Sequence, residues 1–180
     1  KQRNLPASRV RVPGGHLNAK FLPLLQEIAE KYGNGTLHLT ARQGFEIPDI
    51  RFEDIPKVNE LLQPVIEGLD INQEIPGKGY TAAGTRNVTA GIGNRVCPFA
   101  CYDTTTFAKR IEKAIFPNDL HFKVALTGCP NDCAKVRMHA FGIMGMTLPQ
   151  YDRARCVNRG ACVKACPRKV GEALTEVNCK

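Results

Sequence analysis

The sequence of 180 residues has no run that approaches the ~18 uncharged apolar residues needed to span a bilayer, and its amino-terminal stretch has no apolar signal core. It has no tryptophan, and aromatic residues make up only 7%. Hydrophobic residues make up 43% and charged residues 23%, close to the usage of globular proteins. We therefore expect a cytoplasmic, globular protein with a packed core and no membrane anchor.

Acidic residues are scarce in the second half of the chain. Residues 81–180 hold fifteen Lys/Arg and seven Asp/Glu, whereas residues 1–80 hold ten of each, so the net charge of +8 belongs to the second half. A basic half indicates a polyanionic partner, which is a nucleic acid, an anionic cofactor or an acidic electron donor. No aromatic stacking motif accompanies the lysines, so we do not expect nucleic-acid binding.

Cysteine is absent from the first ninety residues, and the eight cysteines that follow are spaced for metal ligation. They are Cys97, Cys101, Cys129, Cys133, Cys156, Cys162, Cys166 and Cys179. Their density is about half of the ~8% typical of disulfide scaffolds. Three pairs share the spacing C-x3-C, and proline adjoins the cysteines in C-P-F-A-C and G-C-P-N-D-C. Because zinc prefers C-x2-C, we expect iron–sulfur ligation, with disulfides as the less favoured alternative.

The first half alternates short strands with two amphipathic helices. Apolar spacing and turn residues predict, in order, a strand, a helix, two strands with Leu37 and Leu39 inward, a second helix and a weak strand. Their ranges are 8–12, 18–32, 36–41, 45–48, 54–68 and 70–72. The order β-α-β-β-α-β is that of a ferredoxin-like unit.

A glycine-rich segment at 75–84 predicts a linker with a boundary near residue 78. Beyond it the pattern predicts a cysteine-bearing loop, a helix, two strands and a basic appendage. Their ranges, after the loop, are 104–116, 121–127, 141–146 and 153–179. The strand 121–127 leads directly into Gly128 and Cys129, so we expect a site at its carboxyl end, as in other α/β folds.

Four motifs of the chain resemble, in the same order, those of the sirohaem sulfite and nitrite reductases. They are R-V-P-G-G (11–15), T-A-R-Q-G-F (40–45), R-N-V-T-A (86–90) and T-G-C-P-N-D-C (127–133). The resemblance covers nearly the whole chain. A short unit with a ferredoxin-type insert is most similar, within that family, to the C subunits of anaerobic sulfite reductases.

This resemblance implies an α+β fold in three parts. Residues 1–78 would form a ferredoxin-like half-domain, residues 79–150 an α/β domain that binds sirohaem and a [4Fe-4S] cluster, and residues 151–180 a partial ferredoxin-type iron–sulfur insert. The implied activity is the six-electron reduction of sulfite to sulfide at sirohaem coupled to the cluster, with nitrite as the alternative substrate.

The resemblance also assigns cluster ligands. Cys97, Cys129 and Cys133 would bind the cluster, and Cys133 would bridge it to the sirohaem iron. Gly91 stands where the family motif has its first cysteine. Three thiolates would suit a [3Fe-4S] cluster, or Cys101 would replace the missing ligand. The alternative for Cys101 is an ordinary buried cysteine that begins a helix.

Cationic residues are assigned in the same way. Arg11 and Arg86 would contact the anionic substrate, while Arg42 would pair with a sirohaem carboxylate. Lys123 matches the second lysine of a family pair whose first member is His121 here, and this histidine either donates a proton or has only a structural role. Asn131 and Lys135 flank the cluster cysteines and would tune the cluster.

The appendage has the sequence C-V-N-R-G-A-C-V-K-A-C-P, which is similar to a ferredoxin run with Arg159 in place of its second cysteine. Cys156 and Cys162, with Cys166 or Cys179, would hold a second, incomplete iron–sulfur cluster. A single unit of this family is expected to pair, as a homodimer or in a hetero-oligomer, and to receive electrons from redox partner subunits or a ferredoxin-like donor. The alternative, which Gly91 and Arg159 motivate, is a degenerate, non-catalytic electron-transfer subunit.

Overall fold

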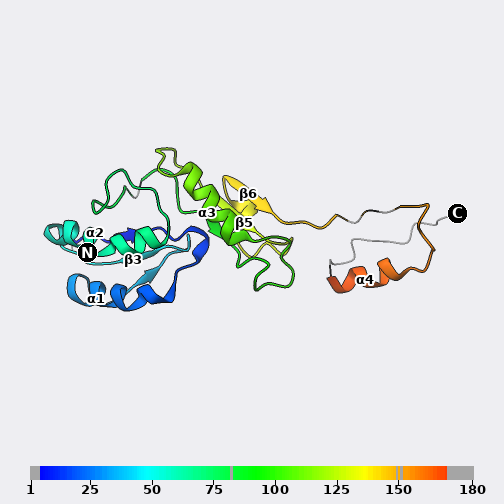
Figure 1. Ribbon diagram of the computed structural model, residues 1–180, viewed down its shortest axis with the longest axis horizontal. Helices are drawn as coiled ribbons and strands as arrows, with labels where there is room; N and C mark the ends of the chain where they lie inside the picture. Colours follow the sequence, from blue (N-terminus) through cyan, green and yellow to red (C-terminus); the bar gives the residue numbers. More distant parts are fainter. Residues whose placement is uncertain (1–4, 82, 149, 151, 170–180) are drawn as a thin grey trace. The chain divides into compact units, whose positions relative to one another are not determined.

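The computed structural model describes residues 5–81, 83–148, 150 and 152–169, and for 166–169 only the backbone (Figure 1). The chain forms two units, residues 1–146 and residues 147–180. Within the described residues no helix is long and apolar enough to cross a membrane. The predicted α+β class agrees with the mixture of helices and sheets found here.

The first sheet is antiparallel, with β3 (Phe45–Ile47) between β1 (Ser8–Val10) and β2 (His38–Leu39). Val10 pairs with Phe45, and Ser8 pairs with Ile47. Side chains alternate between the two faces of a strand, so Phe45 and Ile47 lie on one face, and both are buried. This face forms one side of the first hydrophobic core.

Two helices, α1 (Leu22–Tyr32) and α2 (Ile55–Gly68), supply the other side of this core (Figure 1). Both have proline in the first turn, where a missing N–H is tolerated. Short 3-10 helices precede them, η2 (Ala19–Phe21) and η3 (Phe52–Asp54). The predicted helices are therefore confirmed, with their first residues wound as 3-10 turns.

Two details of the predicted first half are wrong. Leu37 and Leu39 are 37% and 79% exposed, because Leu37 precedes β2 and β2 is an edge strand of two residues that are both exposed. The expected weak strand at 70–72 is absent. Asp70 has a φ of 55°, and the Ile71 N–H donates to the Ile66 carbonyl, so this segment closes the end of α2.

The second sheet is parallel, with β5 (Val124–Thr127) between β4 (Thr89–Ala90) and β6 (Phe141–Met144). Helix α3 (Thr104–Ile115) connects β4 to β5 and packs on the sheet, and η4 (Val136–Met138) precedes β6. The predicted helix 104–116 is confirmed almost to the residue. The expected strands at 121–127 and 141–146 are present but shorter.

The P-G-G turn, η1 (Pro13–Gly15), joins the first sheet to the second. The Gly14 N–H donates to the Val88 carbonyl over 2.9 Å, and a Cβ on Gly14 would lie 3.1 Å from the Ala108 Cβ of α3. Gly14 also has a φ of 68°, which favours glycine. The turn therefore needs glycine both for its backbone and for close packing.

The second unit contains one described helix, α4 (Ala161–Lys169). Within it, Cys162 is exposed.

Candidate functional site

The carboxyl ends of β4 and β5 bring two sequence motifs together. Beyond the strand pairing, the Gly91 N–H donates to the Leu126 carbonyl over 2.9 Å, while Gly128 and Cys129 follow directly after β5. Carboxyl ends of neighbouring parallel strands meet at the same edge of a sheet. Position 91, at the end of T-A-G, and Cys129 therefore lie at one edge of the sheet. The sequence predicted the place of Cys129 at the end of its strand, whereas β4 was not predicted.

The loop between β4 and α3 contacts this edge through a backbone hydrogen bond. The Cys97 N–H donates to the Gly93 carbonyl over 2.9 Å, and the Cys101 N–H donates to the Gly128 carbonyl over 2.7 Å. Cys97 is half-buried, whereas Cys101 is exposed, and α3 begins only at Thr104. The alternative of a buried cysteine at the start of the helix is therefore wrong.

Cys133 belongs to the tight turn that follows Cys129. The Asp132 N–H donates to the Cys129 carbonyl over 3.2 Å, and Asp132 and Lys135 have φ values of 51° and 53°. The Asn131 side-chain amide donates to the Cys133 Sγ over 3.3 Å. A hydrogen bond to sulfur stabilises a thiolate, so the geometry suits the tuning role predicted for Asn131.

The donor set of this edge fits an iron–sulfur cluster. Four cysteines lie on adjoining loops, namely Cys97, Cys101, Cys129 and Cys133. Among the described residues, no three His, Cys, Asp or Glu side chains are close enough to hold a single metal ion. A [4Fe-4S] cluster has a different requirement, because each thiolate binds a separate iron. There is also room at the edge, since a Cβ on Gly91 would have no heavy atom within 4 Å.

The predicted substrate cations lie at the opposite end of the same sheet. The Arg86 N–H donates to the Phe122 carbonyl and the Phe141 N–H to the Lys123 carbonyl, so both positions precede the paired strands. His121 and Lys123 are exposed. The four residues of β5, at about 3.3 Å each, separate Lys123 from the cysteine edge by about 13 Å or more. Within one chain, the backbone positions of these cations and the cysteine edge thus lie at opposite ends of the second sheet.

A cavity of about 140 Å³ lies near the amino end of this sheet, and its lining is strongly basic. It is lined by Arg9, Arg11, Arg42 and Arg86, with Tyr80 and Asn87 among the other residues. The Arg42 Nη2 donates to the carbonyls of Asn87 and Val124 over 2.5 and 2.8 Å. Its Nε and Nη1 are buried and have no partner within the described structure. An anion such as a carboxylate would satisfy both donors.

The surroundings of Arg42 also lower its pKa. Burial lowers the pKa of Arg42, a nearby carboxylate offsets part of this, and the charges of Arg11 and Arg86 lower it further. A bound anion would relieve both the desolvation and the repulsion. The residue therefore fits the predicted contact with a cofactor carboxylate.

Arg11 is largely occupied by the protein itself. Its Nε forms a buried ion pair with Glu112, its Nη1 donates to the Thr85 carbonyl over 2.6 Å, and its guanidinium lies 3.8 Å from the centre of the Phe116 ring. Within the described residues, its Nη2 is buried without a partner. The substrate contact predicted for Arg11 stays a prediction, and only this nitrogen is available for it.

Two functional neighbours were missed by the sequence reasoning. The Gln43 side chain exchanges two hydrogen bonds with the backbone of Ala90, over 2.7 and 2.8 Å, and so holds β4 next to position 91. Glu112 is a buried acid, one turn after the buried Ala108 on α3. A charge on the apolar face of a predicted helix signals a buried partner, and this signal was available in the sequence.

The second unit carries its own cysteines. Cys156 and Cys162 are exposed, and the Asn158 N–H donates to the Cys156 Sγ over 3.4 Å. The side chain of Cys166, and the whole of Cys179, lie outside the described residues. The role predicted for this set in a second cluster stays a prediction.

Comparison with known families agrees with this geometry. Residues 1–65 match the nitrite/sulfite reductase ferredoxin-like half domain, and residues 81–170 match the nitrite and sulphite reductase 4Fe-4S domain. The chain belongs to the nitrite and sulfite reductase family, a family of oxidoreductases that use sirohaem and a [4Fe-4S] cluster. The predicted resemblance, the fold class and the sirohaem and [4Fe-4S] cofactors are thereby confirmed, while the second cluster stays a prediction.

Three proteins show how similar this chain is to known sulfite reductases. The C subunit of the anaerobic sulfite reductase of Salmonella typhimurium is 46% identical over 87% of this chain and 48% of its own length. The coenzyme F420-dependent sulfite reductase of Methanocaldococcus jannaschii is 32% identical over 88% of this chain and 24% of its own length. The crystal structure of dissimilatory sulfite reductase I has a TM-score of 0.63 at 19% identity, over 88% of this chain and 36% of that one. The chain thus spans about half the length of the C subunits that it matches.

Proposed function

We propose that this chain is the catalytic unit of a sulfite reductase, in which sulfite is reduced to sulfide at a sirohaem coupled to a [4Fe-4S] cluster. The observation that carries the proposal is the cysteine-bearing edge of the second sheet, in a chain 46% identical to anaerobic sulfite reductase C subunits. The basic cavity around Arg42 supports it, because two buried donors there lack a partner in the described structure.

Particular residues would hold the two groups. Cys97, Cys129 and Cys133 would ligate the cluster, with Cys133 as the bridge, and Arg42 would pair with a sirohaem carboxylate. When bound, the coupled groups supply electrons to the substrate without release of intermediates. Asn131 donates to the Cys133 sulfur and would stabilise its thiolate form.

The remaining cations would handle the substrate. Arg86 and Lys123 would bind the sulfite oxygens and stabilise their negative charge, and His121 would donate protons as each oxygen leaves as water. Six electrons and six protons convert hydrogensulfite to hydrosulfide and three waters. The electrons would come from redox partner subunits or a ferredoxin-like donor in the cytoplasm, docking on the basic half.

Two chains would have to share each site. The backbone of Lys123 lies about 13 Å or more from the cysteine edge of the same chain, so a neighbouring chain would supply the missing half. We infer a homodimer or a hetero-oligomer, in which residues 1–78 are scaffold, residues 79–150 hold the cofactors and residues 151–180 form the electron-entry insert with its own cluster.

A second candidate function is favoured by two substitutions. Gly91 and Arg159 each remove a cysteine that the family motifs would have. A chain with incomplete clusters would act as a non-catalytic sirohaem-holding or electron-transfer subunit. Nitrite is the alternative substrate for the active form, because both oxyanions suit the same cations.

Anaerobic purification, sirohaem extraction, iron and sulfide counting, and EPR would test the proposal. The catalytic function predicts sirohaem, a reducible cluster and sulfite-dependent oxidation of a viologen donor. Lys123→Ala should lower kcat/KM for sulfite by about 100-fold, whereas the exposed Lys57→Ala serves as a control with little effect. Bound sirohaem whose spectrum shifts with sulfite, but without turnover, would favour the second candidate. A protein that binds neither group would contradict both.

A further inference from the structure

Gly91 leaves one iron of the expected cluster without a thiolate. The residue follows β4 at the cysteine edge, and a Cβ there would meet no heavy atom within 4 Å. The three matched cysteines, Cys97, Cys129 and Cys133, supply one ligand fewer than a [4Fe-4S] cluster needs. A further donor is required at this edge if the cluster is complete.

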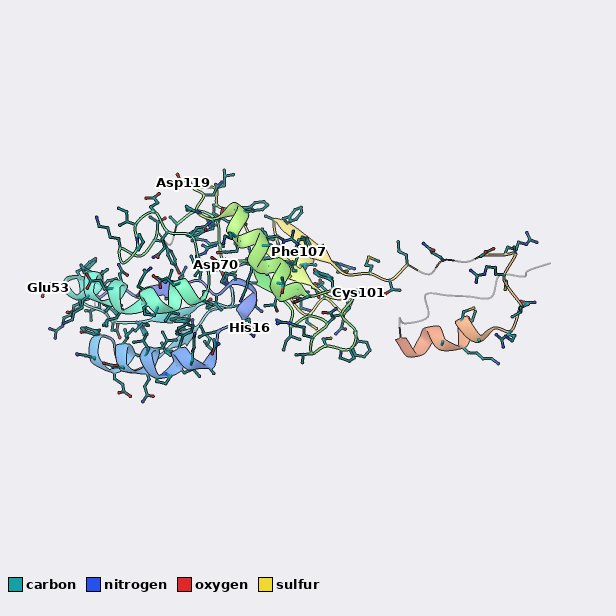
Figure 2. The ribbon with its side chains drawn as sticks, viewed as in Figure 1. His16, Glu53, Asp70, Cys101, Phe107 and Asp119 are labelled. Atoms are coloured by element: carbon teal, nitrogen blue, oxygen red, sulfur yellow. The ribbon has the colours of Figure 1, made fainter. Side chains whose placement is uncertain are left out.

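Cys101 lies next to the matched ligands. Its backbone N–H donates to the carbonyl of Gly128, the residue before Cys129, over 2.7 Å. This approach is close, because a Cβ on Gly128 would overlap the Cβ of Ala100. Cys101 is exposed, so its side chain is not part of a packed core (Figure 2). Its position is therefore fixed by the backbone, and the residue is exposed.

The same turn is tied to position 91. The Thr104 hydroxyl donates to the Gly91 carbonyl, and the Asn94 N–H donates to the Tyr102 carbonyl over 3.1 Å. The segment around Cys101 thus runs beside the segment that begins at Gly91. A thiolate at 101 and a thiolate at 91 would belong to the same edge of the sheet.

We propose that Cys101 supplies the fourth thiolate of the [4Fe-4S] cluster in place of residue 91. The inference rests on the proposed function only in assuming a cluster at this edge. The inference concerns the ligand set of this chain. Cys101, which follows Cys97 at the spacing C-x3-C, would replace the ligand that is missing at Gly91. The cluster is then complete despite the altered motif.

The test uses the full chain purified anaerobically, with iron and sulfide counts and EPR. Cys101→Ala should give the signal of an oxidised [3Fe-4S] cluster and lose about a quarter of the iron at this site. The double variant Cys101→Ala/Gly91→Cys should regain the [4Fe-4S] form, because position 91 has room for a side chain. Cys162→Ala controls for iron in the second unit, and Cys129→Ala controls for the cluster itself.

The outcomes separate this inference from the proposed function. If Cys129→Ala loses the cluster but Cys101→Ala keeps its full iron and its EPR signal, Cys101 is not a ligand and the function stands. If neither substitution changes the iron content, there is no cluster at this edge and the proposed function fails as well.

Alkylation provides a measurement that needs no variant. Mass spectrometry of the cluster-loaded protein should show Cys101 protected from iodoacetamide, with rapid modification after iron is removed by a chelator. Equal modification in both states would overturn the inference, even if Cys101→Ala did not fold.

Discussion

Arg11 and Glu112, which are 101 residues apart in the sequence, form an ion pair whose side chains are only 6% and 3% exposed. The pair joins the end of β1 to α3, and the second carboxylate oxygen accepts the Val88 N–H over 3.1 Å. One carboxylate therefore fixes both the P-G-G region and the segment that leads into β4.

Replacement of Glu112 by alanine should be strongly destabilising. It would leave the Arg11 guanidinium buried and unpaired, which costs about 3–5 kcal/mol in the free energy of unfolding. Urea denaturation measures this change. Lys113→Ala is a matched control, because the Lys113–Asp70 pair is 58% and 71% exposed and should contribute at most about 1 kcal/mol. Equal losses in the two variants would contradict the central role of the buried pair.

Tyr80 should make the protein sensitive to alkali. Its hydroxyl oxygen accepts the Arg11 N–H over 2.7 Å, and burial raises its pKa to about 12. Because the folded protein then holds this proton more tightly than the unfolded chain, stability is complete below pH 10 and falls as the pH rises toward 12. Tyrosinate absorbance and urea denaturation between these values test the prediction. In Tyr80→Phe the free energy of unfolding should lose this part of its pH dependence; an unchanged decline would assign it to another group.

Two glycines at the cysteine edge should respond in opposite ways to alanine. A Cβ on Gly91 would meet open space, so Gly91→Ala should be neutral or stabilising by at most about 1 kcal/mol. A Cβ on Gly145 would overlap the Gly128 carbonyl, so Gly145→Ala should cost about 1–3 kcal/mol. Urea denaturation of both variants gives the comparison. A large loss in Gly91→Ala would show that the space beside it is not available to a side chain.

Asp103 should stabilise the start of α3 in a pH-dependent way. Its carboxylate accepts the N–H groups of Thr105 and Thr106. The hydrogen bond from the Thr106 hydroxyl is the main reason that the pKa of Asp103 is lowered. Asp103→Ala should lower the free energy of unfolding by about 1 kcal/mol at neutral pH.

The sign of the pH effect follows from the lowered pKa. The stabilisation by Asp103 is present above the unfolded pKa of 3.8 and is lost as the pH falls through the lower folded value. NMR titration of the Asp103 carboxyl measures that value directly. Asp103→Asn should retain most of the cap at neutral pH without this titration, and a normal carboxyl pKa in the parent protein would contradict the prediction.

Local sequence signals predicted the helices well. The predicted helix 104–116 corresponds to α3, which spans Thr104–Ile115 and is amphipathic. The strands were harder to predict. β4 has only two residues, which is too few for a period-two pattern, and the alternation around Leu39 predicts two faces without saying which is covered.

The sequence by itself determined the chemistry that is available: thiolates in C-x3-C pairs, arginines in family motifs, and the loss of one cysteine at Gly91. Only the tertiary structure decided what these groups contact. The hydrogen bond from Cys101 to Gly128 and the pairing of Arg11 with Glu112 both join distant segments. Such contacts depend on strand register and helix packing, which are set by the burial of the whole core rather than by local residue patterns.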